Sequence, residues 1–279
     1  MTSFQKRITT AAVALPLLFI IIFFLPQMNH LAFAILIIIA SFFAVNEMND
    51  MCSKKGKVSR ITYLAPLLPL TQYILMYRNM DTSLTFYLFI LMSAIVMLIQ
   101  IFKGAKDNFD SSIDVAARSS LVLIYPGLLA TFLIDLLYLP DASAYILLFL
   151  ALIFGSDSFA YFTGIAFGKN NKGFVKVSPN KSIAGFIGGT VIPGIVGLCA
   201  ALIWPEIFTF GALGGFILGF IVSVFGSLGD LLESTIKRSA NMKDSGVIIP
   251  GRGGILDSID SILIGCPFFI IILHIMGVA

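Results

Sequence analysis

The chain has 279 residues, of which 58% are hydrophobic and only 12% are charged, and its mean hydropathy is +0.98. So apolar a composition leaves too few polar side chains to cover a soluble globule, which excludes a soluble protein. The net charge of +3 comes from the asymmetry of the loops and gives no sign of nucleic-acid binding, and we expect no nucleic-acid partner. The three cysteines are scattered without the spacing of a metal or redox site.

Long apolar runs recur along the whole chain. Each is about 17 to 25 residues long, which is enough for a helix to cross the hydrocarbon core of a bilayer. We therefore predict an all-α, polytopic integral membrane protein with about nine transmembrane helices. The predicted spans are 8–25, 31–47, 61–77, 84–102, 119–138, 143–166, 182–204, 207–228 and 261–278.

The basic residues predict the orientation of these spans, because cytoplasmic loops carry the excess of Lys and Arg. With a cytoplasmic N-terminus, every Lys and Arg except Arg78 falls on the cytoplasmic side. The first span follows Lys6 and Arg7 as a signal peptide would, but no small-residue cleavage site precedes Pro26, so we expect a retained helix. We predict a multi-pass protein of the cell inner (cytoplasmic) membrane with its active site facing the cytoplasm.

The two halves of the chain differ in texture. Residues 1–150 are bulky and rich in Phe, Ile and Leu, and we expect them to form a scaffold of transmembrane helices with a role in dimerisation. Residues 151–279 are expected to form the catalytic transmembrane region with its cytoplasmic loops. Glycines recur there at intervals of four, which lets neighbouring helices approach closely. They are Gly164 and Gly168, Gly185 and Gly189, and Gly211, Gly215 and Gly219.

Acidic residues occur inside or beside the predicted spans of the second half. A carboxylate within hydrocarbon costs at least about 2.5 to 3.5 kcal/mol, so each needs a partner, a cation or a water-filled cavity. Two plainer explanations stay open, namely a surface ion pair of Glu233 with Lys237 and two solvated acids at a helix start for Asp257 and Asp260. The acids are Asp157, midway along the sixth span, and Asp230, Glu233, Asp244, Asp257 and Asp260.

The segment between these acids carries signals for a second kind of ligand. Carboxylates without His or Cys favour Mg²⁺, which usually binds one or two carboxylates together with substrate phosphates. The glycines of 250–254 (PGRGG) allow tight turns whose backbone N–H groups could converge on an anion. Lys237, Arg238, Lys243 and Arg252 add positive charge. In the preceding loop, KVSPNKS at 176–182 is basic, although its serines could simply cap a helix.

The residues of this segment resemble the signature of the phosphatidate cytidylyltransferase family. The matching residues are Ser234, Lys237, Arg238, Lys243, Asp244, Gly246, Pro250, Gly253, Gly254, Asp257 and Asp260. GSDSFAYFTGIAFGK and SPNKSIAGFIGG resemble two further family blocks, so the resemblance covers roughly residues 155–265. Arg252 stands where the family usually has His, and Ser258 where it usually has Arg.

The resemblance implies a Mg²⁺-dependent reaction of CTP with phosphatidic acid that gives CDP-diacylglycerol and pyrophosphate, carried out by a homodimer in the bilayer. It implies metal ligands at Asp230, Asp257 and Asp260, with Asp244 and Glu233 in supporting positions. Lys237, Arg238, Lys243 and Arg252 would bind phosphates. The substrate pocket would further include Asp157, Lys181, Ser182, Ser234, Gly253 and Gly254.

Two alternatives come from other functional classes. An ion-coupled transporter would use the intramembrane acids as a cation or proton path, but such proteins usually contain two related halves with broken helices, and the sequence contains no such pair. A CTP-dependent lipid kinase or a CDP-archaeol-type synthase would differ in the group transferred or in the lipid acceptor. Labelled CTP distinguishes these possibilities.

Overall fold

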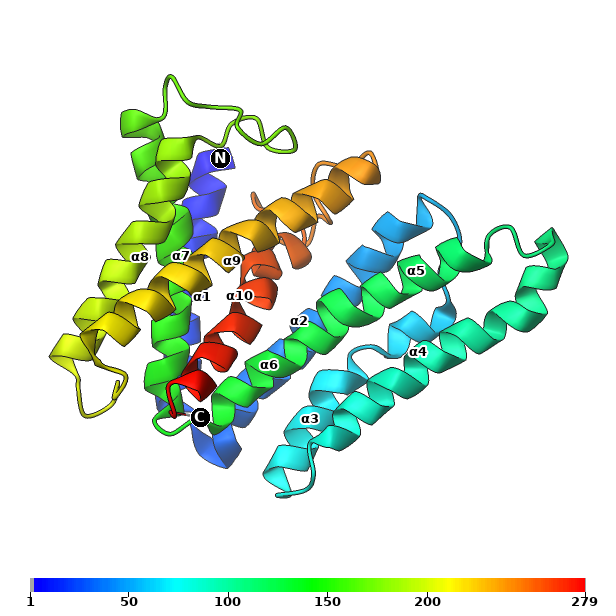
Figure 1. Cartoon of the computed structure of the whole chain (residues 1–279), viewed down its shortest axis with the longest axis horizontal. Coiled ribbons are helices and arrows are strands. Elements are labelled where there is room, and N and C mark those ends of the chain that lie inside the picture. The colour runs from blue at the N-terminus through cyan, green and yellow to red at the C-terminus, as the bar shows by residue number, and fades with distance from the viewer. Residues whose placement is uncertain (1–2, 279) are drawn as a thin grey trace. The chain divides into compact units, whose positions relative to one another are not determined.

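The computed structural model describes residues 3–278, which form helices joined mostly by short loops (Figure 1). No strand forms within these residues apart from two isolated bridges, so the predicted all-α class is confirmed. The helices are α1 (Ser3–Phe24), α2 (Gln27–Ser53), α3 (Leu67–Tyr77), α4 (Ser83–Lys103), α5 (Ser112–Val122), α6 (Leu129–Asp135), α7 (Ala142–Phe167), α8 (Ile183–Ile203), α9 (Gly211–Ser239) and α10 (Leu256–Ile275).

Seven helical segments among the described residues are long and apolar enough to cross a membrane. They are Gln27–Ser53, Ser83–Lys103, Ser112–Tyr138, Ala142–Phe167, Ile183–Ile203, Gly211–Ser239 and Leu256–Ile275. A multi-pass membrane protein is therefore confirmed, whereas the predicted number of nine spans is not. The predicted span 8–25 coincides with a shorter apolar helix, Ala12–Phe24. The predicted span 61–77 is divided between a 3₁₀ turn, Arg60–Leu64, and α3.

Prolines explain why the predicted span 61–77 is not one long helix. The segment begins as a 3₁₀ turn, Arg60–Leu64, and α3 starts only after Pro66. A proline has no amide hydrogen and clashes with the preceding turn, so the ladder of helical hydrogen bonds is interrupted there. The 11 residues of α3 extend about 16 Å, which is roughly half of the hydrocarbon core.

The chain divides into two compact units that do not follow the sequence order. The first unit contains the chain up to Ile134 together with Ser239–Ser258, and the second contains Asp135–Arg238 together with the segment from Ile259 onward. The loop between α9 and α10 (residues 240–255, called the α9–α10 loop below) therefore belongs to the same unit as α2. The predicted division of roles at residue 150 stays a prediction.

Buried polar side chains of α2 tie the first unit together. Ser41 donates to the carbonyl of Pro126 at 2.6 Å, within the π-turn Leu123–Leu128 that joins α5 to α6. Asn49 accepts a hydrogen bond of 2.8 Å from Thr62. In an apolar surrounding each of these bonds satisfies a group that would otherwise be costly to bury. Side chains of α2 thus connect two other segments of the first unit through buried hydrogen bonds.

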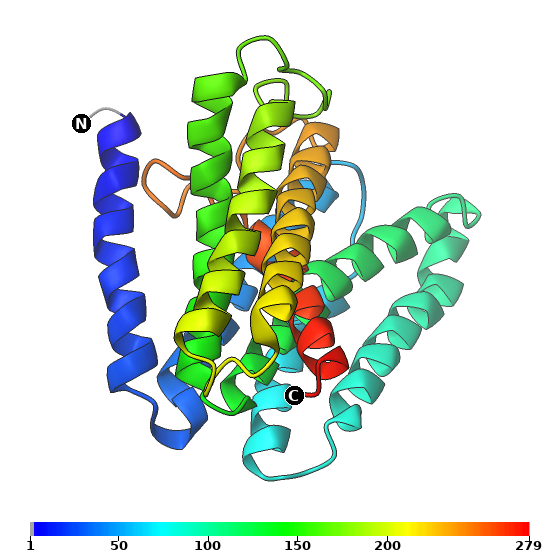
Figure 2. The same cartoon turned by 60° about the vertical axis from the view of Figure 1, so that its left-hand side comes forward.

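Glycines bring the helices of the second unit into close contact. Figure 2 shows α7, α8 and α9 side by side. A Cβ added at Gly197 of α8 would overlap the carbonyl of Gly215 on α9, and a Cβ at Gly189 would lie 2.9 Å from the carbonyl of Ser156 on α7. The backbone of α8 therefore lies in close contact with the backbones of both α7 and α9, as the four-residue spacing of the glycines predicts.

We expect Gly197→Ala to destabilise the protein by about 1 to 3 kcal/mol, because the new methyl group forces α8 away from α9. Gly155→Ala on α7 is the matched control, since its Cβ would meet only a phenyl ring at 3.9 Å. Thermal unfolding in detergent, followed by the fluorescence of the only tryptophan, Trp204, measures both variants. Equal melting temperatures for the two variants would contradict this account of the packing.

Candidate functional site

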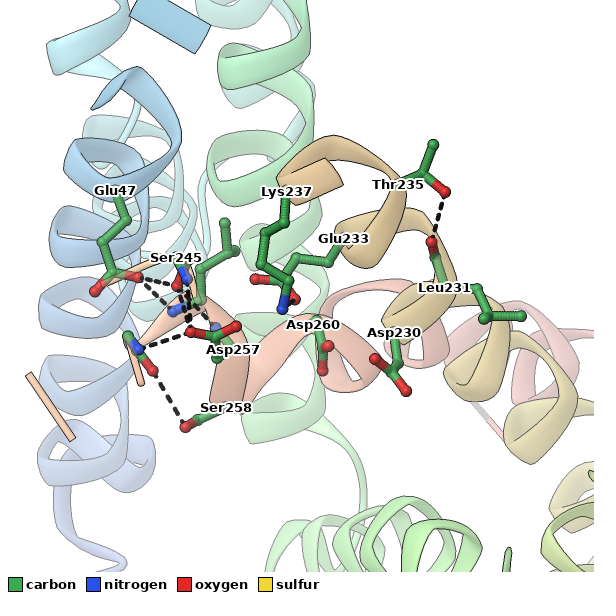
Figure 3. Close-up of polar contacts among 12 residues, drawn as sticks. Glu47, Asp230, Leu231, Glu233, Thr235, Lys237, Ser245, Asp257, Ser258 and Asp260 are labelled. Atoms are coloured by element: carbon green, nitrogen blue, oxygen red, sulfur yellow. Dashed lines mark hydrogen bonds and ion pairs between the residues drawn. The ribbon is translucent and has the colours of Figure 1, made fainter. Parts of the chain in front are cut away.

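Acidic side chains from three helices interact in the second unit, and we call Asp157, Asp230 and Asp260 the acidic cluster. Asp260 of α10 is only 8% exposed, and the charges of Asp230 on α9 and Asp157 on α7 both act on its carboxylate. Figure 3 shows the side chains of Asp230 and Asp260 next to one another. Like charges at this depth repel strongly, so the cluster favours the binding of positive charge.

A glycine positions α9 against α10 at the acidic cluster. A Cβ added at Gly229 would lie 2.7 Å from the backbone oxygen of Asp260 and 3.0 Å from the Cβ of Ile264. Gly229 immediately precedes Asp230 in the chain. The absence of a side chain at residue 229 therefore allows the two acid-bearing turns to lie side by side.

Two lysines accompany the acidic cluster. The ammonium group of Lys181 lies 2.5 Å from Oδ2 of Asp230, and each side chain is about one-third exposed. Lys237 forms an ion pair with Glu233 one turn earlier on α9, and its charge also acts on Asp260 (Figure 3). The sequence left open a surface pair of Glu233 with Lys237, but Glu233 is fully buried and Lys237 nearly so. The solvated-pair explanation is therefore wrong.

Ser182 ends the basic segment before α8 and caps that helix. Its hydroxyl accepts a hydrogen bond of 3.0 Å from the amide of Gly185, which confirms the capping explanation for this serine. Ser234 and Arg238 lie on α9, and the Arg238 side chain is exposed. Because Ser182 directly follows Lys181, the cap also fixes the backbone from which that lysine extends.

The α9–α10 loop carries the remaining predicted residues, all in the first unit. Lys243, Asp244 and Arg252 are exposed. The PGRGG segment closes as a tight turn, in which the amides of Arg252 and Gly253 donate to the carbonyl of Ile249 at 3.1 and 3.0 Å. Gly253 has a φ of +115°, a conformation that favours glycine. These two amides thus donate within the loop itself.

Asp257 in the first turn of α10 binds this loop. Its Oδ2 accepts from the amide of Ser245 at 2.8 Å, the hydroxyl of Ser245 at 2.9 Å and the amide of Gly254 at 2.8 Å (Figure 3). Asp257 and Asp260 stand three residues apart on the same helix, as the sequence predicts. The structure thus shows a structural contact of Asp257 that sequence reasoning did not anticipate.

Glu47 of α2 is a residue that the sequence analysis missed. It is only 5% exposed, and its carboxylate accepts from the hydroxyl of Ser245 at 2.9 Å and from the amides of Ile255 and Leu256 at 2.9 and 2.8 Å. Glu47 carries the same signal as the acids of the second half, because it is an acidic residue within a predicted apolar span. The bulky, apolar composition of residues 1–150 predicts a scaffold and gives no other sign of this acid's role.

The acidic cluster fits a hard divalent cation. Its donors are carboxylate oxygens, and two of its members, Asp230 and Asp260, are held together on adjacent helices. Within residues 3–278 no group of three or more His, Cys, Asp or Glu side chains is arranged to hold a metal ion. Mg²⁺ commonly binds one or two carboxylates and completes its ligands with substrate phosphates and water. A pair of acids suffices for such a site.

Comparison with known proteins gives a consistent family. The chain matches the cytidylyltransferase family over residues 5–276. It is 34% identical to a phosphatidate cytidylyltransferase of Bacillus subtilis over 280 residues, which cover 98% of each chain. It is 32% identical to a phosphatidate cytidylyltransferase of Staphylococcus haemolyticus over 271 residues, covering 96% of this chain and 98% of the relative. A Haemophilus influenzae protein of the same name is 41% identical over 160 residues, about half of each chain.

The buried pair of Glu233 and Lys237 predicts an asymmetric response to mutation. Glu233→Gln leaves the Lys237 ammonium buried without its partner charge, and we expect a loss of about 3 to 5 kcal/mol of stability. The double variant Glu233→Gln with Lys237→Gln removes both charges and should recover most of that loss. Melting temperatures in detergent of the wild type, the single variants Glu233→Gln and Lys237→Gln, and the double variant test this, and additive losses in the double variant would show that the pair is not coupled.

Proposed function

The chain belongs to the cytidylyltransferase family, and from this membership we propose that it is a phosphatidate cytidylyltransferase. It transfers CMP from CTP to phosphatidic acid and releases pyrophosphate, which gives CDP-diacylglycerol for phospholipid synthesis. Relatives of this name match nearly the full length of the chain. The observation that carries the proposal is the acidic cluster with its lysines, which lies on apolar helices. A charged nucleotide and the phosphate of a membrane lipid would have to meet at such a place.

The reaction needs no nucleophile from the protein. An oxygen of the lipid phosphate forms a bond to the α-phosphorus of CTP, and the bond from that phosphorus to the oxygen bridging to the β-phosphorus breaks. Because both reactants are anions, the protein has to bring them together and offset their charge. We assign this role in the second unit to Lys181 and Lys237, which form ion pairs with Asp230 and Glu233. We also assign phosphate binding to three exposed cations, Arg238, Lys243 and Arg252.

Mg²⁺ is the cofactor that we propose, with the pair Asp230 and Asp260 of the acidic cluster as its ligands. Asp257, three residues before Asp260 on α10, binds the α9–α10 loop, and we assign it to holding the start of that helix. When bound, Mg²⁺ neutralises charge on the triphosphate and stabilises pyrophosphate as a leaving group. Lys181, at 2.5 Å from Asp230, orients that carboxylate and adds a positive charge beside it. Glu233 holds Lys237 toward the cluster, and the Asp260 carboxylate is in turn stabilised by the charge of Lys237.

The substitution of Arg252 for the usual family histidine removes a group that titrates near neutral pH. An arginine stays protonated and donates to phosphate, so we assign it to phosphate binding and not to proton transfer. Ser258, which replaces the usual arginine, has its hydroxyl 3.4 Å from the carbonyl of Gly254. We propose that the positive charge of Arg252 offsets the charge that Ser258 lacks.

The membrane setting follows from the substrate. A site in apolar helices lets the phosphate of the lipid reach the cations while its acyl chains stay in the bilayer, and we propose a cytoplasmic-facing site in the inner membrane. Large apolar side chains are exposed along α4, as expected of a helix that faces lipid. They include Leu91, Met97, Leu98, Ile101 and Phe102. We propose a homodimer on the family resemblance alone. The glycine-rich faces of α8 and α9 pack against each other within the chain and therefore do not support a dimer interface.

Labelled CTP tests the reaction directly. We expect that purified protein, given phosphatidic acid and Mg²⁺, transfers ³²P from the α-position of CTP into lipid and leaves the γ-label in pyrophosphate. Scintillation counting of the organic phase measures both. Transfer of the γ-label would identify a lipid kinase, and transfer of neither label would contradict the proposal and favour a transporter.

Two variants connect this activity to the acidic cluster. Asp230→Asn and Asp260→Asn should each lower the turnover number on the order of 100- to 1,000-fold, since each removes a charge at the reacting phosphates. Asp114→Asn is the matched control, because Asp114 is an exposed acid paired with Arg118 on the surface of α5. Near wild-type turnover in either cluster variant would remove the cluster from the site.

A further inference from the structure

Glu47 reaches the α9–α10 loop from α2, almost 200 residues away in the sequence. Both of its oxygens accept hydrogen bonds, Oε1 from the amide of Ile255 and Oε2 from the amide of Leu256 and the hydroxyl of Ser245. All of these donors lie between residues 245 and 256. Figure 3 shows the Glu47 carboxylate directed at this loop.

The start of α10 depends on the two carboxylates that meet there. The first amides of a helix have no partner within the helix and carry its positive partial charge. Glu47 binds the amides of Ile255 and Leu256, and Asp257 binds the amide of Gly254. The amide of Asp257 itself points to the hydroxyl oxygen of Ser245 at 3.3 Å. Glu47, which lies on another helix, therefore accepts hydrogen bonds from two of the four backbone amides of residues 254–257.

Ser245 connects Glu47 to Asp257. Its hydroxyl oxygen lies 2.9 Å from Oε2 of Glu47 and 2.9 Å from Oδ2 of Asp257, so its single proton is shared between two carboxylates. The amide of Ser245 donates to the same Oδ2 at 2.8 Å. Any displacement of Glu47 therefore changes the position of Ser245, and with it the carboxylate of Asp257.

The loop is shaped around the Glu47 carboxylate by two glycines. A Cβ added at Gly246 would lie 2.6 Å from Oε1 of Glu47, and a Cβ at Gly254 would overlap Oε2 and the hydroxyl of Ser245. Neither glycine has a positive φ, so space and not backbone conformation explains the need for glycine at both. Two other buried polar side chains of α2, Ser41 and Asn49, form hydrogen bonds with Pro126 and Thr62 instead.

We propose that Glu47 is a positioning residue for the cytidylyl transfer reaction, holding Asp257 through Ser245 and fixing the first turn of α10. The inference rests on the proposed function, which gives α10 its role at the reacting phosphates through Asp260. It assigns a part of the reaction to the half of the chain expected to be only scaffold. Glu47 acts on the reaction through the loop and does not itself touch substrate.

Glu47→Gln tests the proposal, because it keeps the size of the side chain but turns one acceptor into a donor that faces loop donors. We expect the turnover number per folded molecule to fall on the order of 100-fold, with the KM for phosphatidic acid within about twofold of wild type. Glu47→Asp, which keeps the carboxylate, should recover part of the turnover. Ser41→Ala on the same helix is the control, since it loses one buried bond outside the loop and should keep its turnover number.

Hydrogen exchange of the backbone amides provides a readout independent of activity. In Glu47→Gln the amides of Ile255 and Leu256 should exchange faster, while Ser41→Ala should leave them unchanged. Ser245→Ala separates the two contacts of Glu47, since it cuts the connection to Asp257 but keeps both amide bonds. We expect a lower turnover number with slow exchange of these two amides.

The outcomes distinguish this inference from the proposed function. A wild-type protein that transfers no α-label would overturn the function, whatever the exchange rates. An active wild type combined with an unchanged turnover number in Glu47→Gln, or with an equal loss in Ser41→Ala, would overturn the role of Glu47 alone. If Glu47→Gln does not fold, Glu47→Asp and Ser245→Ala are measured in its place, and unchanged turnover in both would overturn it.

Discussion

An ionised side chain inside an apolar helix bundle must be matched by opposite charge or by hydrogen-bond donors, because the surrounding medium cannot solvate it. The structure meets this constraint in different ways at different acids. Glu233 has a lysine one turn away, and Glu47 has three donors from the α9–α10 loop and the first residue of α10. In the acidic cluster the carboxylates act on one another, with Lys181 and Lys237 as the cations beside them. An excess of negative charge at this place favours a divalent cation and the phosphates that come with it.

Close helix packing is what makes such a cluster possible. Gly229 lets α9 approach the backbone of Asp260, and the glycines of α8 and α9 remove the side chains that would separate those helices. The bilayer provides no hydrophobic force between helices, so contact of the backbones is a main source of their association. Under the proposed function, the same packing brings the charged site within reach of lipid. A phosphate on a lipid can enter such a site without removing its acyl chains from the membrane.

Much of the fold could be predicted from the sequence, because long apolar runs and glycine spacing are local signals. The interruption at Pro66 does not follow from hydropathy, because the run 61–77 stays apolar across it. In the site, the acids and the lysines were recognisable from their position in apolar surroundings. The burial of Glu233 was not, because helical spacing does not reveal which face of α9 other helices cover. Glu47 and its loop donors are separated by about 200 residues, and no local pattern connects them.

The central claim is that Asp230 and Asp260 together bind the divalent cation that accompanies CTP. Mn²⁺ can replace Mg²⁺ at oxygen sites and has an electron paramagnetic resonance signal that is lost on binding to protein. The most direct measurement is a titration of Mn²⁺ in the presence of CTP, comparing wild type with Asp230→Asn and Asp260→Asn. The account predicts that wild type binds Mn²⁺ and that each variant binds it at least tenfold more weakly. Undiminished Mn²⁺ binding by both folded variants would contradict it.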